Sequence, residues 1–272
     1  MAVRDRALAR LFGRSGWKMS LGERSALEGI LSALEPSVSI EIGTLKGGSL
    51  ERVAAHSEIV HSFDLRFDRD VGRDRFPNVV FHEGDSHVLL RETLEQLARA
   101  GTNLDFALVD GDHSGPGVRQ DLGDLLSSPC TQRTVILLHD TLNERVRAGV
   151  RDVDLERDKV THVELDFVVG QVWGGGPFDH DFWGGLGLVL TGWDVRPAPK
   201  NARPLYDAAD VFATFRRTVA DRGEIERPRY GELAELERQL ADARAAMQLM
   251  ERSLSWRLTA PLRRAKGAVR RS

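Results

Sequence analysis

The sequence has very little cysteine, because Cys130 is the only one among its 272 residues. A single cysteine excludes a disulfide within the chain and fits a reducing compartment such as the cytoplasm. Long apolar runs are also missing, since no stretch approaches the roughly 20 apolar residues that a membrane-spanning helix requires. The charged start, with Arg4 and Arg6, predicts no secretory signal. We therefore expect a cytoplasmic protein.

A strong charge of either sign is lacking too, with a formal net charge of -3. A protein that binds nucleic acid through bulk electrostatics needs a large positive charge, so no nucleic-acid partner is expected. Hydrophobic residues make up 41% and charged residues 29% of the chain, which is typical of a soluble globular protein. The length suggests one sizeable domain with an appendage.

The first 36 residues are predicted to form an N-terminal helical cap, with helix over 5–35. Ser20 and Glu23 have the spacing of a capping box, in which each residue satisfies a backbone N–H of the other. Apolar residues then recur at helical spacing until Pro36 ends the helix.

Short apolar runs alternate with helical patterns over residues 37–195, the predicted core. Such alternation indicates a parallel sheet with crossover helices. Buried parallel strands are continuous apolar and β-branched runs, as they are here. The predicted strands are Ser37–Ile42, Ile59–Phe63, Val79–His82, Phe106–Val109 and Val135–Leu138, and the predicted helices are Ser49–His56, Ser86–Ala100 and Gly117–Leu126.

Two later strands, His162–Val169 and Gly187–Leu190, are joined by a loop rich in glycine and aromatic residues. They are expected to form an antiparallel pair at one edge of the sheet. The predicted fold is therefore α/β, a doubly wound sheet of seven strands, mostly parallel, with an antiparallel edge hairpin.

The rest of the chain differs in composition. Residues 196–229 are predicted to be a connector with one short helix, Ala208–Asp221. Residues 230–256 carry a heptad seam without glycine or proline after Gly231, which is typical of a coiled coil. Residues 257–272 form a basic tail.

Glycines follow the first predicted strand, at Gly43, Gly47 and Gly48. They allow the backbone to approach a ligand closely and to turn into the next helix. The spacing is not G-x-G-x-x-G, which argues against a dinucleotide. The second strand ends in Asp64, which could accept hydrogen bonds from ribose hydroxyls, and the third in Gly84-Asp85-Ser86, which could reach an adenine edge. A tight turn without a ligand, and a surface acid at Asp64, are the alternatives.

The ordered motifs E-I-G-T-x-x-G-G-S, a strand ending in Asp, G-D-S, V-D-G-D-H and L-L-H-D-T are similar to those of class I methyltransferases. They most resemble the catechol-type and macrocin-type O-methyltransferases, a branch that includes proteins named cephalosporin hydroxylase. The resemblance covers about residues 15 to 192. It implies a Rossmann-like core and S-adenosylmethionine as cofactor, held by Glu41, Gly43, Thr44, Gly47, Ser49, Asp64, Asp85, Ser86 and Asp110.

Asp110 and Asp140 end adjacent predicted strands, where two carboxylates suit a cation such as Mg2+. The resemblance implies metal ligands at Asp110, Asp140 and Thr141, although relatives often have Asn, Asp or Glu at the third position. It also implies a general base at His113, and an ordinary histidine pKa suits this role. A histidine that only caps or packs is the alternative. The predicted catalytic residues are therefore His113, Asp110 and Asp140.

Several neighbouring residues have less defined roles. Asp112 could orient His113 or join the metal shell, whereas His139 should point to the opposite side of its strand from Asp140 and be structural. Trp17 either covers the cofactor or packs in the core. The loop Val172–Trp183 is either an acceptor lid or an edge loop whose aromatic residues pack on the sheet.

The C-terminal residues 230–272 are compatible with more than one kind of binding partner. The heptad seam predicts a homo-oligomer, or else one helix packed on its own domain. The segment Ser253–Arg263 resembles one found beside coiled coils in enzymes of surface-polysaccharide assembly. It could dock on such enzymes, lie at the inner face of the membrane, or be disordered. The expected acceptor is a sugar hydroxyl of a bacterial glycan or glycosylated metabolite. A small phenol or catechol, and a catalytically silent adaptor, are the alternatives.

Overall fold

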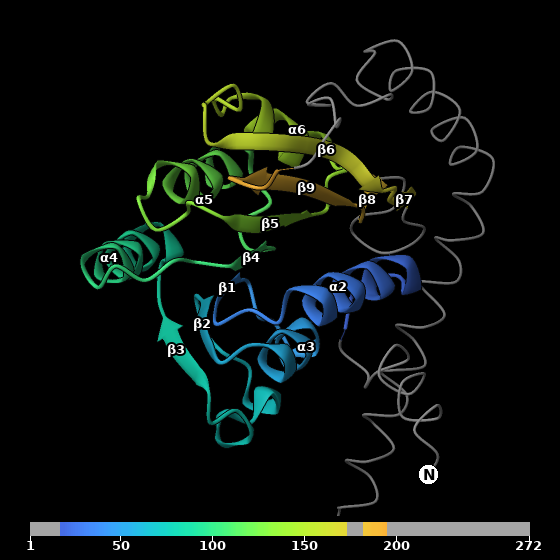
Figure 1. Cartoon of the computed structure of the whole chain (residues 1–272). Helices are drawn as coiled ribbons and strands as arrows, with labels where there is room; N and C mark the ends of the chain where they lie inside the picture. Colours follow the sequence, from blue (N-terminus) through green and yellow to red (C-terminus); the bar gives the residue numbers. More distant parts are fainter. Residues whose placement is uncertain (1–16, 173–181, 195–272) are drawn as a thin grey trace, which may run out of the picture. The chain divides into compact units, whose positions relative to one another are not determined.

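The computed structural model describes residues 17–172 and 182–194, and Figure 1 shows their arrangement. The chain divides into two units, Met1–Val211 and Phe212–Ser272, and the described residues all lie in the first. The predicted connector, coiled coil and basic tail (196–272) lie outside the described residues, as does most of the loop 172–183. None of the helices among the described residues has the length and apolar character to span a membrane.

A seven-stranded sheet has the strand order β3-β2-β1-β4-β5-β9-β6. Its parallel strands are β1 (Val38–Ile42), β2 (Ile59–Asp64), β3 (Val79–Glu83), β4 (Phe106–Val109) and β5 (Thr134–His139). The strand β9 (Leu186–Thr191) runs antiparallel to both β5 and the edge strand β6 (Val160–Val168). The predicted fold class, including the antiparallel pair at the edge, is confirmed.

Helices cover both faces of this sheet (Figure 1). Helices α4 (Ser86–Arg99), α5 (Gly115–Ser127) and α6 (Glu144–Arg151) pack on one face, where Ile40 and Ile136 are fully buried. Helices α2 (Leu21–Leu34) and α3 (Gly48–His56) pack on the other, against Leu108 and Leu137. Alternate residues of each central strand therefore enter two separate cores, which explains the continuous apolar runs in the sequence.

Helix α2 begins after the predicted cap Ser20 and ends before Pro36, as predicted. The prediction of helix over 5–35 is wrong at residues 17–20, which are not helical, and residues 5–16 lie outside the described residues. Ser20 is its N-cap, and the Ser20–Glu23 capping box is present. The helix stops at Glu35, which adopts a left-handed conformation (φ 43°) just before Pro36. Glu23 is nevertheless buried, which an ordinary capping residue at a helix start is not. This burial brings a carboxylate of α2 into the interior.

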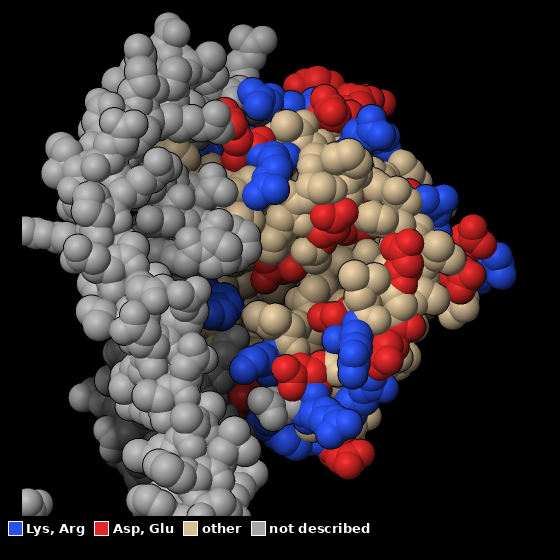
Figure 2. All heavy atoms as spheres, turned by 180° about the vertical axis from the view of Figure 1, so that it is seen from behind, with Lys and Arg blue, Asp and Glu red and all other residues tan. Residues whose placement is uncertain are grey.

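Short elements complete the described fold. Two 3-10 turns, η1 (Arg69–Val71) and η2 (Arg73–Arg75), connect β2 to β3. The strands β7 (Gln171–Val172) and β8 (Phe182–Trp183) form a separate two-stranded sheet between β6 and β9. On the face shown in Figure 2, acidic and basic side chains are interspersed over the described residues.

Candidate active site

A cavity of about 1060 Å³ opens where β1, β2, β4 and β5 end. Topology predicts a ligand site here, because β1 and β4 continue the chain in opposite directions across the sheet. The predicted site residues that line it are Gly43, Thr44, Ser49, Asp64, Asp85, Ser86, Asp110, His113 and Asp140. The structure therefore brings most of the predicted cofactor and catalytic residues to one cavity.

The loop after β1 is fastened to the end of β2. The backbone N–H groups of Thr44 and Leu45 both donate to Oδ2 of Asp64, each at 3.0 Å. The other oxygen of Asp64 accepts the N–H of Arg66 at 3.0 Å. Asp64 thus has a role that its sequence position did not reveal, because it shapes the glycine loop while lining the cavity.

Gly43 is held against the end of β4. Its φ is +86°, and a Cβ built on it would lie 2.1 Å from the carbonyl oxygen of Asp110. No other residue type fits such a contact, so the first glycine of the motif is required by backbone packing. This packing also places the glycine loop directly beside a predicted catalytic acid.

Glu41 and Gly47 are not among the residues that line the cavity. Glu41 is fully buried in β1, where its carboxyl oxygens accept the hydroxyls of Thr44 (3.0 Å) and Ser49 (2.7 Å). Burial raises its pKa to about 8, although these hydroxyls oppose the shift. Gly47 caps α3 with a left-handed backbone. Both residues therefore stabilise the conformation of the glycine loop, Glu41 through its hydrogen bonds with Thr44 and Ser49.

At the end of β3, Asp85 is the N-cap of α4. Its Oδ1 accepts the N–H of His87 at 3.0 Å, while Ser86 begins the helix. Both Asp85 and Ser86 line the cavity, on the side opposite the β5 end of the site. A contact of these residues with an adenine edge stays a prediction.

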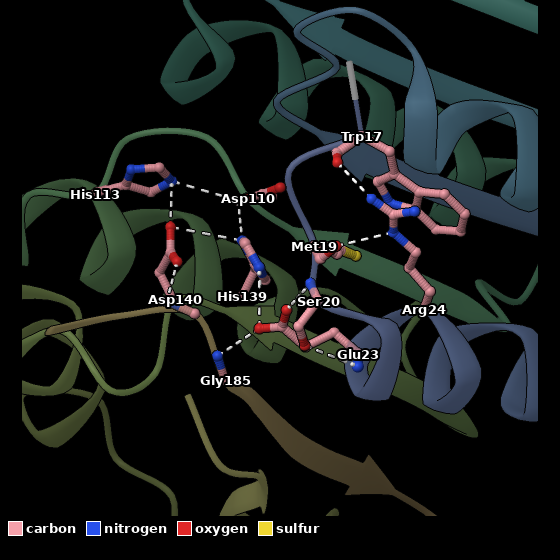
Figure 3. Close-up of polar contacts among 11 residues, drawn as sticks. Trp17, Met19, Ser20, Glu23, Arg24, Asp110, His113, His139, Asp140 and Gly185 are labelled. Atoms are coloured by element: carbon pink, nitrogen blue, oxygen red, sulfur yellow. Dashed lines mark hydrogen bonds and ion pairs between the residues drawn. The ribbon is translucent and has the colours of Figure 1, made fainter. Parts of the chain in front are cut away.

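The predicted catalytic residues form one cluster, shown in Figure 3. Oδ1 of Asp110 lies 3.3 Å from Nε2 of His113 and 2.7 Å from Nδ1 of His139. Oδ2 of Asp140 lies 3.4 Å from Nε2 of His113 and 3.5 Å from Nδ1 of His139. Two carboxylates therefore share two imidazoles at the ends of β4 and β5.

The carboxylates of this cluster stabilise a proton on either histidine. Burial alone would raise the pKa of Asp110, but the charge of His139 and hydrogen bonds from both histidines lower it to about 2. Burial would lower the pKa of His113 and of His139, but the neighbouring carboxylates raise both, that of His139 strongly. Burial raises the pKa of Asp140. A proton that reaches His113 is therefore stabilised there.

The orientation predicted for His139 is wrong, because this side chain lines the cavity and contacts the same groups as Asp140. Strict alternation applies only within a strand, and β5 ends at His139. Asp140 already lies in the turn, with a left-handed φ of 57° that re-aims its side chain. The suggested role of Asp112 is not observed either, since its carboxylate accepts both the N–H and the hydroxyl of Ser114 at 2.8 Å.

Among the described residues, Asp110, His139 and Asp140 can place one ligand atom each within 4.8 Å of one another, so they could hold a metal ion. Thr141, the predicted third ligand, is not part of this group and does not line the cavity. Its side chain is buried beside Gly185 and Gly187. The set brought together is therefore two carboxylates and an imidazole. Mg2+ prefers oxygen ligands, whereas imidazole suits zinc and other transition metals.

Aromatic residues border the cluster and the loop. The ring of Trp183 meets that of His113 edge-on, with 5.5 Å between the ring centroids. Trp17 lines the cavity and packs against Gly48, while the guanidinium of Arg24 lies 4.7 Å above its ring. Trp17 thus lines the cavity and also packs in a core, so the two positions predicted for it do not exclude each other.

Comparisons with known proteins agree with this geometry. Residues 40–141 match a family model described as a methyltransferase domain, Methyltransf_24. The match supports the predicted methyltransferase domain over these residues. No curated protein matches the chain significantly.

Solved structures of similar fold include three O-methyltransferases. The chain is 17% identical to a putative O-methyltransferase from Klebsiella pneumoniae, over 71% of this chain and 91% of that one (TM-score 0.47). It is 18% identical to an O-methyltransferase from Bacillus cereus in complex with SAH, over 70% and 88% (TM-score 0.46). It is 16% identical to the O-methyltransferase TomG from Streptomyces achromogenes, involved in tomaymycin synthesis and solved with SAM, over 64% and 82% (TM-score 0.45).

Proposed function

We propose that the chain transfers a methyl group from S-adenosylmethionine to a hydroxyl oxygen, and that the acceptor is a sugar of a bacterial surface glycan or glycosylated metabolite. The observation that carries the proposal is the position of His113. Its Nε2 atom lies beside both Asp110 and Asp140, in the cavity that the glycine loop borders.

The cavity suits the cofactor, which when bound supplies a methyl group already activated by a sulfonium. Gly43 allows a tight turn after β1. The glycine loop, held by its hydrogen bonds to Asp64, forms the side of the cavity next to β2. Asp85 and Ser86 lie at the adenine side. These residues bind and orient, and in a reaction with an activated methyl such positioning contributes most of the rate.

His113 acts as the general base in this proposal. It accepts the proton of the acceptor hydroxyl as the oxygen attacks the methyl carbon in one SN2 step. Asp110 and Asp140 then stabilise the imidazolium, as the direction of the His113 pKa shift indicates. Trp183, edge-on to His113, would border the acceptor and exclude water.

A divalent cation is a separate part of the proposal. Asp110, His139 and Asp140 would hold it, and it would lower the pKa of a bound hydroxyl. Mg2+ was the predicted ion, but the imidazole in the donor set favours an ion such as Mn2+ or Zn2+. The steps assigned to His113 do not depend on it.

Two alternatives differ from the leading proposal in their acceptor or in their class. A phenol or catechol acceptor is supported by the aromatic border at Trp183, while the predicted polysaccharide-type tail favours a glycan. A silent adaptor would retain the fold without turnover. Thr141, where relatives often carry a ligand, is the feature that supports it.

An assay with labelled S-adenosylmethionine and three acceptor sets (methyl glycosides, nucleotide sugars and catechol) tests the leading proposal and both alternatives. We expect methyl transfer to methyl glycosides or nucleotide sugars, and none to catechol. Transfer only to catechol would support the phenol alternative, and tight cofactor binding without any transfer would support the adaptor. Repeating the assay with EDTA and then added Mg2+, Mn2+ or Zn2+ decides whether a metal contributes. Failure of a folded sample to bind S-adenosylhomocysteine in a calorimetric titration would contradict the cofactor assignment.

The partners proposed for the tail need a different experiment. We propose that residues 230–272 mediate self-association and contact either polysaccharide-assembly enzymes or the inner face of the membrane. Co-sedimentation with anionic vesicles compares the full chain with a chain ending near Arg229. Equal binding by both would exclude the tail as a membrane anchor, and sedimentation equilibrium of the same pair measures its share in oligomer formation.

A further inference from the structure

Glu23 connects helix α2 to the candidate active site, although it comes from outside the sheet (Figure 3). Only 3% of this residue is exposed. One carboxylate oxygen, Oε2, accepts the N–H of Ser20 and completes the helix cap. The other, Oε1, accepts the N–H of Gly185, which precedes β9. The helix cap therefore involves only Oε2, while Oε1 faces the cluster of Asp110, His113, His139 and Asp140.

The imidazole of His139 lies between Glu23 and Asp110. Its Nε2 atom is 3.4 Å from Oε1 of Glu23, and its Nδ1 atom is 2.7 Å from Oδ1 of Asp110. The ring is buried, and carboxylates from α2 and β4 face its two nitrogens. Rotation of the ring would break both contacts. The ring therefore fixes the oxygen of Asp110 that also lies 3.3 Å from His113.

The same oxygen of Glu23 also controls the turn that holds Asp140. Gly184 donates its N–H to Oδ1 of Asp140 at 2.6 Å, and the next N–H, that of Gly185, goes to Glu23. Both glycines have left-handed backbones, with φ of 73° and 87°. A Cβ on Gly184 would lie 2.9 Å from Oε1 of Glu23. Glu23 thus reaches both catalytic acids, each through one intermediate group.

We propose that Glu23 is a positioning residue for methyl transfer, which holds Asp110 through His139 and Asp140 through the Gly184–Gly185 turn. This inference rests on the proposed function. It assigns to helix α2 a direct part in aligning the base His113, beyond its packing on the sheet. Because a displacement of about 1 Å at a reacting group can cost about 100-fold in rate, such alignment is measurable.

The first test needs no acceptor. Imidazole 15N NMR of the full chain, with His139→Gln used for assignment, compares wild type with Glu23→Gln. Gln keeps the size of the side chain but loses the charge and one acceptor oxygen. The matched control is Glu28→Gln, which removes a carboxylate of the same helix that pairs with Arg52 outside the site. We expect the His139 signals to shift in the first variant only; unchanged signals there would overturn the proposal.

The second test measures turnover with the methyl glycosides and nucleotide sugars. We expect Glu23→Gln to bind S-adenosylhomocysteine like wild type while kcat falls about 10- to 100-fold and the KM values change little. A Glu23→Gln, His139→Gln double variant should lose less than the two single losses combined, because both residues hold Asp110 through one contact chain, while the contact of Glu23 with Gly185 does not pass through His139. A wild-type kcat in Glu23→Gln, or additive losses, would refute a positioning role.

Two outcomes remain distinguishable from failure of this inference. If no acceptor is methylated, the proposed function is contradicted, and the NMR comparison still decides whether Glu23 fixes His139. If Glu23→Gln does not fold, His139→Gln leaves the helix cap intact and repeats the kinetic test. Wild-type kcat in that variant would overturn the proposal.

Discussion

The carbonyl oxygen of Asp110 lies 2.1 Å from the position that a Cβ of Gly43 would occupy. The glycine loop after β1 and the end of β4 are therefore packed backbone to backbone. A change at either residue should be transmitted to the other, because neither backbone has room to retreat.

Replacing Gly43 by alanine should accordingly damage both folding and binding. We expect Gly43→Ala to lower the free energy of unfolding by about 2 kcal/mol or more, from the positive φ and the contact with Asp110. Affinity for S-adenosylhomocysteine should fall with it. Gly29→Ala is the matched control, since nothing lies within 4 Å of its Cβ position in helix α2. That variant should be neutral or stabilised by up to about 1 kcal/mol in a denaturant titration. Equal stability of the two variants would refute the packing argument.

Removing the imidazole of His113 should separate binding from turnover. We expect His113→Ala to retain cofactor binding and to lose about 100- to 10,000-fold in kcat, the range for a general base. Calorimetry and a labelled-methyl assay measure the two effects. His56→Gln, at the end of helix α3 and outside the cavity, should keep wild-type turnover. Full activity in His113→Ala would remove it as the base.

Glu41 should affect the pH dependence of stability more than cofactor binding. Its pKa is raised from 4.5 to about 8, so between these values the folded chain keeps a proton that the unfolded chain loses. Stability therefore falls as pH rises through this window. Glu41→Gln should remove that loss and raise the free energy of unfolding at pH 8 by about 1 kcal/mol or more. Affinity for S-adenosylhomocysteine should change little, and a large drop would show that Glu41 contacts the cofactor after all.

The sequence predicted the sheet and the cavity better than the details of the cluster. The parallel strands and the ends of β1, β2, β4 and β5 follow from apolar runs, which are local, whereas the strand order was not predicted. The orientation of His139 depends on one left-handed residue, Asp140, that period-two alternation cannot anticipate. Glu23 was recognised as a capping residue, but its contacts with Gly185 and His139 span more than one hundred residues. No local pattern encodes such a contact.

Helix α6 is an element that the sequence patterns did not predict. No element was predicted over Glu144–Arg151, since arginine and glycine alternate there with valine and alanine. The helix forms because Asn143 caps it and because Arg147, fully buried, donates to the carbonyl of Thr141 and to Asp166. Val146 and Val150 have helical spacing and are buried, but two apolar positions in eight residues are too short a pattern to predict a helix.

The histidine pair of β2 and β3 should make the protein sensitive to mild acid. Nδ1 of His61 lies 3.0 Å from Nε2 of His82, and burial followed by the charge of His82 lowers the pKa of His61 from 6.5 to about 4. Between these values the unfolded chain binds a proton that the folded chain does not, so stability is lost as pH falls through this window. His61→Gln should therefore unfold at a temperature that depends less on pH between about 6.5 and 5. Thermal unfolding of wild type and His61→Gln across this range measures the difference between their unfolding temperatures at each pH. Titrating groups that the two proteins share contribute equally to both. Parallel curves for the two proteins would show that His61 carries no such cost.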